Sequence, residues 1–142
     1  MPLMTDEVTA QLKDEFAQLV NPVRLAVFSQ ALADPESEQV RRLAEELVAL
    51  EPRLSLEPYN FVLDKEKAEA LKIARIPAMA VMGAEKDYGI RMYGLPSGYE
   101  FGTLIEAILD VSRGDSGLSD ETRVALKELA QPVHIQVFST PT

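Results

Sequence analysis

The chain has 142 residues, of which 46% are apolar, enough for one compact domain with a buried core. Its 23 acidic and 14 basic residues give a formal net charge of −9, which excludes nucleic acid and anionic membrane surfaces as expected partners. It holds no cysteine and one histidine, so we expect no thiol chemistry, no metal site and no cofactor within these residues. The acidic start and the lack of a long apolar run favour a cytoplasmic protein without a membrane segment.

The first fifty residues predict a helix, a strand and a second helix. Thr5 is suited to cap the first helix, whose apolar residues recur at helical spacing until the Asn-Pro pair at 21–22. Residues 23–29 are apolar on both faces after their second position, which is typical of a central, covered strand. Asp34 and Pro35 then stand where a helix cap and a first helical residue belong.

The remaining elements are a strand, a short helix, two strands and a helix, predicted at residues 54–62, 64–75, 77–82, 88–93 and 97–114. The proline at position 58 suggests an edge position for the first of these strands. The last two strands are too close in sequence for a crossover, so they must be antiparallel. Ser97 and Glu100 have the spacing of a capping box. This order predicts an α/β fold with a four-stranded mixed sheet and helices on both faces.

The chain contains an internal repeat. Residues 131–140 match residues 21–30 at five of ten positions, and the helical segments before them, 120–130 and 6–20, also share several residues. A duplicated unit explains this pattern. We therefore expect a domain, a linker and the incomplete start of a second unit, at residues 1–112, 113–118 and 119–142.

The end of the chain predicts a strand without neighbours. Val133, Ile135 and Val137 alternate with other side chains, so residues 133–139 have the pattern of a strand. A central strand with two unpaired edges is costly or adhesive. We expect it to add to a sheet edge, to pair with another copy in a homo-oligomer, or to be poorly ordered.

The order of elements, with Pro77 opening the third strand, resembles the thioredoxin and glutaredoxin fold. In that fold a cis-proline begins the strand that faces the redox motif, so the resemblance implies a cis bond between Ile76 and Pro77 and a substrate-binding role for both residues. Segments 90–114 and 132–142 resemble the two-domain protein disulfide oxidoreductases, glutaredoxin-like proteins with tandem thioredoxin units. In these proteins the Thr-Pro-Thr phrase runs directly into Cys-Pro-Tyr-Cys.

The resemblance implies that the chain is truncated just before the nucleophilic cysteine of the second unit. The missing C-terminal thioredoxin-like domain is then the expected partner, with protein disulfides as substrates. Aligning the repeats places Ala33, Asp34, Pro35 and Glu36 where the first unit would carry its own Cys-x-x-Cys. The start of a helix suits a thiolate there, but carboxylates cannot exchange electrons. We therefore assign no catalytic residue to this chain.

Other uses of the charged side chains are less well supported. Asp34 and Glu36 are two residues apart, so on a helix they diverge and make a poor pair for acid–base catalysis. His134 aligns with Arg24 at the start of a strand and is expected at the surface.

Three functional interpretations stay open. The first is a redox-silent N-terminal domain that scaffolds the active domain of a disulfide oxidoreductase and extends its substrate surface. The second is a module that binds an extended peptide beside Ile76 and Pro77 without chemistry. The third is the N-terminal electron-shuttle arm of the flavoprotein component of an alkyl hydroperoxide reductase, whose tandem plan is a weaker match.

Overall fold

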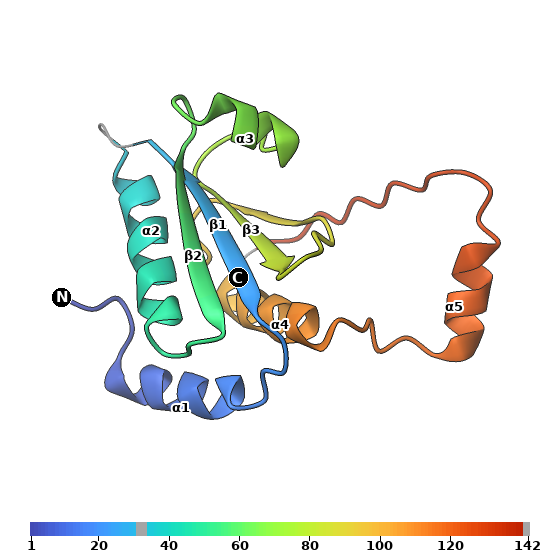
Figure 1. Ribbon diagram of the computed structural model, residues 1–142, viewed down its shortest axis with the longest axis horizontal. Coiled ribbons are helices and arrows are strands. Elements are labelled where there is room, and N and C mark those ends of the chain that lie inside the picture. Colours follow the sequence, from blue (N-terminus) through green and yellow to red (C-terminus); the bar gives the residue numbers. More distant parts are fainter. Residues whose placement is uncertain (31–33, 141–142) are drawn as a thin grey trace.

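The computed structural model describes residues 1–30 and 34–140 and has the predicted α/β architecture (Figure 1). In chain order its elements are α1 (Asp6–Phe16), β1 (Val23–Ser29), α2 (Pro35–Val48), β2 (Leu54–Asn60), α3 (Lys65–Ala70), β3 (Ala78–Gly83), β4 (Ile90–Tyr93), α4 (Tyr99–Arg113) and α5 (Asp120–Lys127). None of the described helices is long and apolar enough to cross a membrane.

The four strands form one mixed sheet in the order β2-β1-β3-β4. β1 runs parallel to β2 and antiparallel to β3, and β4 returns antiparallel along β3. β1 is almost entirely buried, because it lies between two strands and is covered on both faces. β2 lies at one edge, which confirms the position inferred from Pro58.

Helices cover both faces of the sheet, as predicted. α2 packs against β1 and β2, and α4 packs against β3 and β1. α2 and α4 share one core with the same face of the sheet, and Leu12 and Phe16 of α1 also belong to that core. On the other face, Ala68 of α3 and the nearby Ile73 join a smaller core around Phe28. Thr5 caps α1 as predicted, since its side chain accepts a hydrogen bond from the backbone N–H of Val8.

Four of the predicted elements, β2, α3, β4 and α4, are shorter in the structure. β2 ends at Asn60 because the Asn60 side chain accepts hydrogen bonds from the backbone N–H groups of Val62 and Leu63 and turns the chain. α3 ends at Ala70, and Lys72 after it has a left-handed backbone with φ of 56°.

Two predicted helix caps were wrong in detail. Gly98, with φ of 59°, takes the N-cap position of α4, so Ser97 and Glu100 do not form a capping box. α2 begins at Pro35 as expected, but the Asp34 side chain makes no capping bond to a described backbone N–H. It accepts a hydrogen bond from the Ser37 hydroxyl instead.

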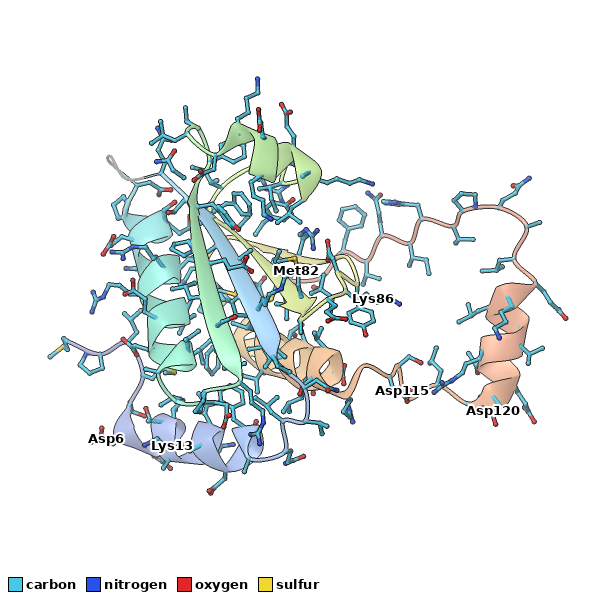
Figure 2. The ribbon with its side chains drawn as sticks, viewed as in Figure 1. Asp6, Lys13, Met82, Lys86, Asp115 and Asp120 are labelled. Atoms are coloured by element: carbon cyan, nitrogen blue, oxygen red, sulfur yellow. The ribbon has the colours of Figure 1, made fainter. Side chains whose placement is uncertain are left out.

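The predicted strand at residues 133–139 is also wrong for this chain. Residues 131–140 form no strand, and their side chains are exposed. Figure 1 shows α5 standing away from the sheet, with the segment after it running back toward the sheet in this view. The labelled Asp115 and Asp120 in Figure 2 mark where the chain leaves α4 and enters α5. The strand does not form because no neighbouring strand receives its N–H and C=O groups.

The β3–β4 hairpin carries an ion pair that predicts a pH effect. The Asp87 carboxylate accepts hydrogen bonds from the Arg91 guanidinium at 2.9 and 2.5 Å and from the backbone N–H of Gly89 at 2.9 Å. The hydrogen bond from Arg91 is the main reason that the pKa of Asp87 is lowered, against the opposing effect of burial.

A lowered folded-state pKa contributes stability above the unfolded carboxyl pKa of about 3.9. That contribution is lost as the pH falls below this value and through the folded pKa. Because the pair is partly exposed, we expect a loss of about 0.5–1 kcal/mol. Urea unfolding of the wild type and Asp87→Asn between pH 6 and pH 3 measures it, and the two stability curves should converge at acid pH. Curves that stay parallel would contradict the assignment.

Candidate functional site

The start of α2 and the segment after β4 meet at the position where a redox motif is expected. Ala33 lies outside the described residues, while Asp34, Pro35 and Glu36 are described. Glu36 lies in the first turn of α2, where backbone N–H groups and the helix dipole favour negative charge. One oxygen of its carboxylate, Oε1, accepts a hydrogen bond of 3.1 Å from the backbone N–H of Leu95.

Gly94, the residue before Leu95, lies close to the Glu36 carboxylate. A Cβ atom placed on Gly94 would lie 3.4 Å from Oε1 of Glu36, and the φ of Gly94 is +80°. A side chain at position 94 would therefore be strained by its backbone and would contact the Glu36 carboxylate. Gly94 thus allows the chain after β4 to approach the start of α2.

The same segment connects to the predicted substrate-binding residues. The peptide bond between Ile76 and Pro77 is cis, as the resemblance implies. The backbone N–H of Gly94 donates a 3.0 Å hydrogen bond to the carbonyl oxygen of Pro77. Since Leu95 bonds Glu36, residues 94 and 95 bring Pro77 and Glu36 together from distant parts of the sequence. Pro77 is buried and Ile76 is half-buried.

The loop before Pro77 is held by residues that the sequence analysis did not single out. The hydroxyl oxygen of Tyr93 accepts a 3.2 Å hydrogen bond from the backbone N–H of Ala74. The guanidinium of Arg75 lies over the Tyr93 ring, 4.2 Å from its centroid, which is a favourable cation–π distance. These contacts could not be predicted from a local sequence pattern, because Tyr93 on β4 and Ala74 in the loop before β3 are 19 residues apart.

Asp34 and Glu36 make separate contacts in the structure. Asp34 accepts a hydrogen bond from Ser37 on its own helix, whereas Glu36 bonds Leu95 on the other side of the site. The two carboxylates thus bond different parts of the chain. The described residues contain no group of three side chains that could hold a metal ion. With no cysteine in the sequence, the groups present here form hydrogen bonds but offer no thiol for disulfide exchange.

The Glu36 contact predicts a modest loss of stability. Glu36→Ala removes a charge-assisted hydrogen bond between α2 and residue 95 in a solvent-exposed setting, so we expect a loss of about 0.5–1.5 kcal/mol in the free energy of unfolding. Glu7→Ala is the matched control, because Glu7 also lies in the first turn of its helix but bonds no other described element. Denaturant unfolding measures both variants, and equal losses would contradict the specific role of Glu36.

The strand order and the helices define a thioredoxin-like fold, and the sequence contains no cysteine. No family model matches the chain. Its sequence is 28% identical to the AhpF protein of the alkyl hydroperoxide reductase of Staphylococcus aureus over 137 residues, which are 95% of this chain and 25% of that protein. The chain therefore spans about a quarter of the length of the curated relatives that it matches.

Two solved structures extend the comparison. The NTD_N/C domain of alkylhydroperoxide reductase AhpF from Enterococcus faecalis superposes with a TM-score of 0.77 at 25% identity, covering 85% of this chain and 58% of that one. A protein disulfide oxidoreductase from Aeropyrum pernix has the same TM-score of 0.77 at 31% identity, covering 88% of this chain and 55% of that one. The similarities thus reach both kinds of protein that the sequence resembles.

Proposed function

We propose that the chain is a non-catalytic thioredoxin-like module of a larger cytoplasmic thiol–disulfide system, in which it supports a redox-active unit and shapes its substrate surface. The observation that carries this proposal is the occupation of the redox position. Glu36 stands at the start of α2 where a reactive cysteine is expected and is hydrogen-bonded to Leu95. A carboxylate in that place keeps the favourable charge at the helix start but cannot transfer electrons.

The wider protein that best fits the module is a flavoprotein of the AhpF type. The match to AhpF over 95% of this chain supports that assignment better than the free disulfide oxidoreductase that the sequence analysis placed first. In this proposal residues 1–112 form the silent unit, residues 113–118 are a linker, and residues 119–142 correspond to the first helix and strand of a second unit. The exposure of residues 131–140 supports this division.

A domain exchange tests the proposal. The matched 137-residue segment of the Staphylococcus aureus protein is replaced by this chain, and the alkyl hydroperoxide reductase activity of the purified chimera is measured. We expect retained activity, because the exchanged part supplies a scaffold and not the reacting thiols.

The control for the domain exchange is a chimera that carries Leu12→Ala, which weakens the packing of α1 in the same graft. It should lose activity together with thermal stability. A folded, monodisperse wild-type chimera without activity would contradict the scaffold assignment.

A further inference from the structure

An open apolar groove runs between α1 and α4. Two hollows form it, with volumes of about 360 and 370 Å³, and they adjoin at Val8 of α1 and Phe101 of α4, which line both. The first hollow continues to Leu95, and the second continues to Leu12 and Ile105. Val8, Phe101 and Leu95 are only half-buried. The groove therefore presents apolar surface that no described segment covers completely.

The groove has dimensions that suit a helix. Its lining residues run from Val8 to Glu15 along α1 and from Gly98 to Glu106 along α4. At a helical rise of about 1.5 Å per residue, each stretch extends roughly 10–12 Å, or two turns. Because helices form the walls, their backbone groups are bonded internally and offer no ladder to an added strand. A third helix, which also satisfies its own backbone, fits such walls better than an extended segment.

Gly102 leaves room for close approach to α4. It lies inside that helix, lines the second hollow and is exposed. A Cβ atom on Gly102 would meet nothing within 4 Å, and the φ of this residue is not in the left-handed region. Neither packing nor backbone geometry among the described residues therefore requires glycine here, although glycine inside a helix lowers stability relative to alanine. The missing side chain lets a partner come close to the helix backbone.

The charged side chains that line the groove are acidic. Glu15 of α1 and Glu106 of α4 line the second hollow, and the lining of both hollows contains no lysine or arginine. Glu15 accepts a hydrogen bond of 3.1 Å from the neutral side chain of Gln11. Neither carboxylate forms an ion pair with a described side chain. A partner with positive charge beside these two carboxylates is therefore favoured over one with negative charge.

We propose that the groove between α1 and α4 binds a basic amphipathic helix of a partner protein. Its apolar residues pack on Val8 and Phe101, one of its side chains lies over Gly102, and its lysine or arginine residues lie beside Glu15 and Glu106. The apolar surface supplies most of the attraction, and the charges select the partner. This interaction does not rest on the redox assignment and is tested separately from it.

A labelled model peptide tests the groove directly. The probe is an amphipathic peptide of about 15 residues with leucine on one face and lysine on the other. Its twin carries glutamate in place of lysine. Fluorescence anisotropy measures the Kd of each peptide for the natural chain. We expect the leucine–lysine peptide to bind and the leucine–glutamate peptide to bind at least about tenfold more weakly.

Gly102→Leu tests the apolar part of the contact. The new side chain would occupy the second hollow, so the Kd of the leucine–lysine peptide should rise at least about tenfold. The matched control is Thr103→Leu, which adds leucine at an exposed position of α4 that lines neither hollow. Its Kd should stay within about twofold of the natural value. Leucine is a better helix former than glycine, so the Tm of Gly102→Leu should not fall, which separates lost binding from lost structure.

Glu15→Gln combined with Glu106→Gln tests the charged part of the contact. At low salt this double variant should raise the Kd of the leucine–lysine peptide at least about fivefold. The control, Glu66→Gln with Glu85→Gln, removes the same charge at exposed positions outside the groove. It should change the Kd by less than about twofold.

Four results would overturn the proposal. An unchanged Kd in Gly102→Leu would show that the peptide binds elsewhere. Equal binding of the two peptides, or equal weakening by the two double variants, would show that the acidic residues of the groove do not select the partner. Sedimentation equilibrium of the natural chain supplies the last: a dimer that Gly102→Leu disrupts would show that a second copy fills the groove.

Discussion

We expect Leu12→Ala to lower the free energy of unfolding by about 2–5 kcal/mol and Leu126→Ala to change it by no more than about 0.5 kcal/mol. The two leucines occupy matching places in the repeat, each followed by a lysine. Leu12 is 4% exposed and packs into the main core through α1, whereas Leu126 on α5 is 50% exposed. Truncating Leu12 leaves a cavity, but truncating Leu126 removes atoms that already contact water.

Urea-induced unfolding of the two variants measures this difference. The comparison is well matched, because the amino-acid change is the same and both residues lie on amphipathic helices. A large loss in both would show that α5 packs on the first unit, and the division into a complete and an incomplete unit would fail. A small loss in both would remove α1 from the core.

Ser112→Ala is expected to have the second largest effect, a loss of about 1–3 kcal/mol, because it leaves partly buried backbone groups without their hydrogen-bond partner. The Ser112 hydroxyl is buried near the end of α4. It accepts hydrogen bonds from the N–H groups of Val20 and Asn21, at 2.9 and 3.1 Å, and donates one of 2.8 Å to the Asn21 carbonyl. The Asn21 side chain in turn donates to the Ser112 carbonyl at 2.8 Å.

These contacts fix the chain between α1 and β1 to the end of α4. Ser97→Ala is the control, since Ser97 is exposed in the segment before α4. Thermal unfolding of both variants should show a lower Tm for Ser112→Ala alone. If Ser112→Ala has the same Tm as the wild type, water has replaced the hydroxyl and the hydrogen bonds of Ser112 contribute little to stability.

The sequence predicted the elements whose signals are local. The apolar run at 23–29 indicated the central strand with its correct bounds, and the short connection between β3 and β4 required their antiparallel pairing. Residues 133–138 carry nearly the same pattern as the central strand but form none. Strand formation depends on neighbours, which an alternating pattern cannot supply.

Contacts across the sequence were beyond local prediction. Glu36 was singled out for its position in the repeat, but its bond to Leu95 spans 59 residues and leaves no mark on either segment. The same is true of Ser112, whose partners are more than 90 residues away. The capping box expected for α4 failed because Gly98 offered a positive φ that the chain uses at that turn. Ser97 and Glu100 have the spacing of a capping box but do not make its hydrogen bonds.

The most direct test of the central claim is the rate at which dithiothreitol reduces insulin disulfides in the presence of the chain and of its double variant, Ala33→Cys with Glu36→Cys. The claim is that a fold suited to hold a reactive sulfur at the start of α2 carries carboxylates there instead. We predict that the natural chain leaves the rate at its uncatalysed value and that the double variant accelerates it. Acceleration by the natural chain, or a folded double variant that neither forms an internal disulfide nor raises the rate, would contradict the account.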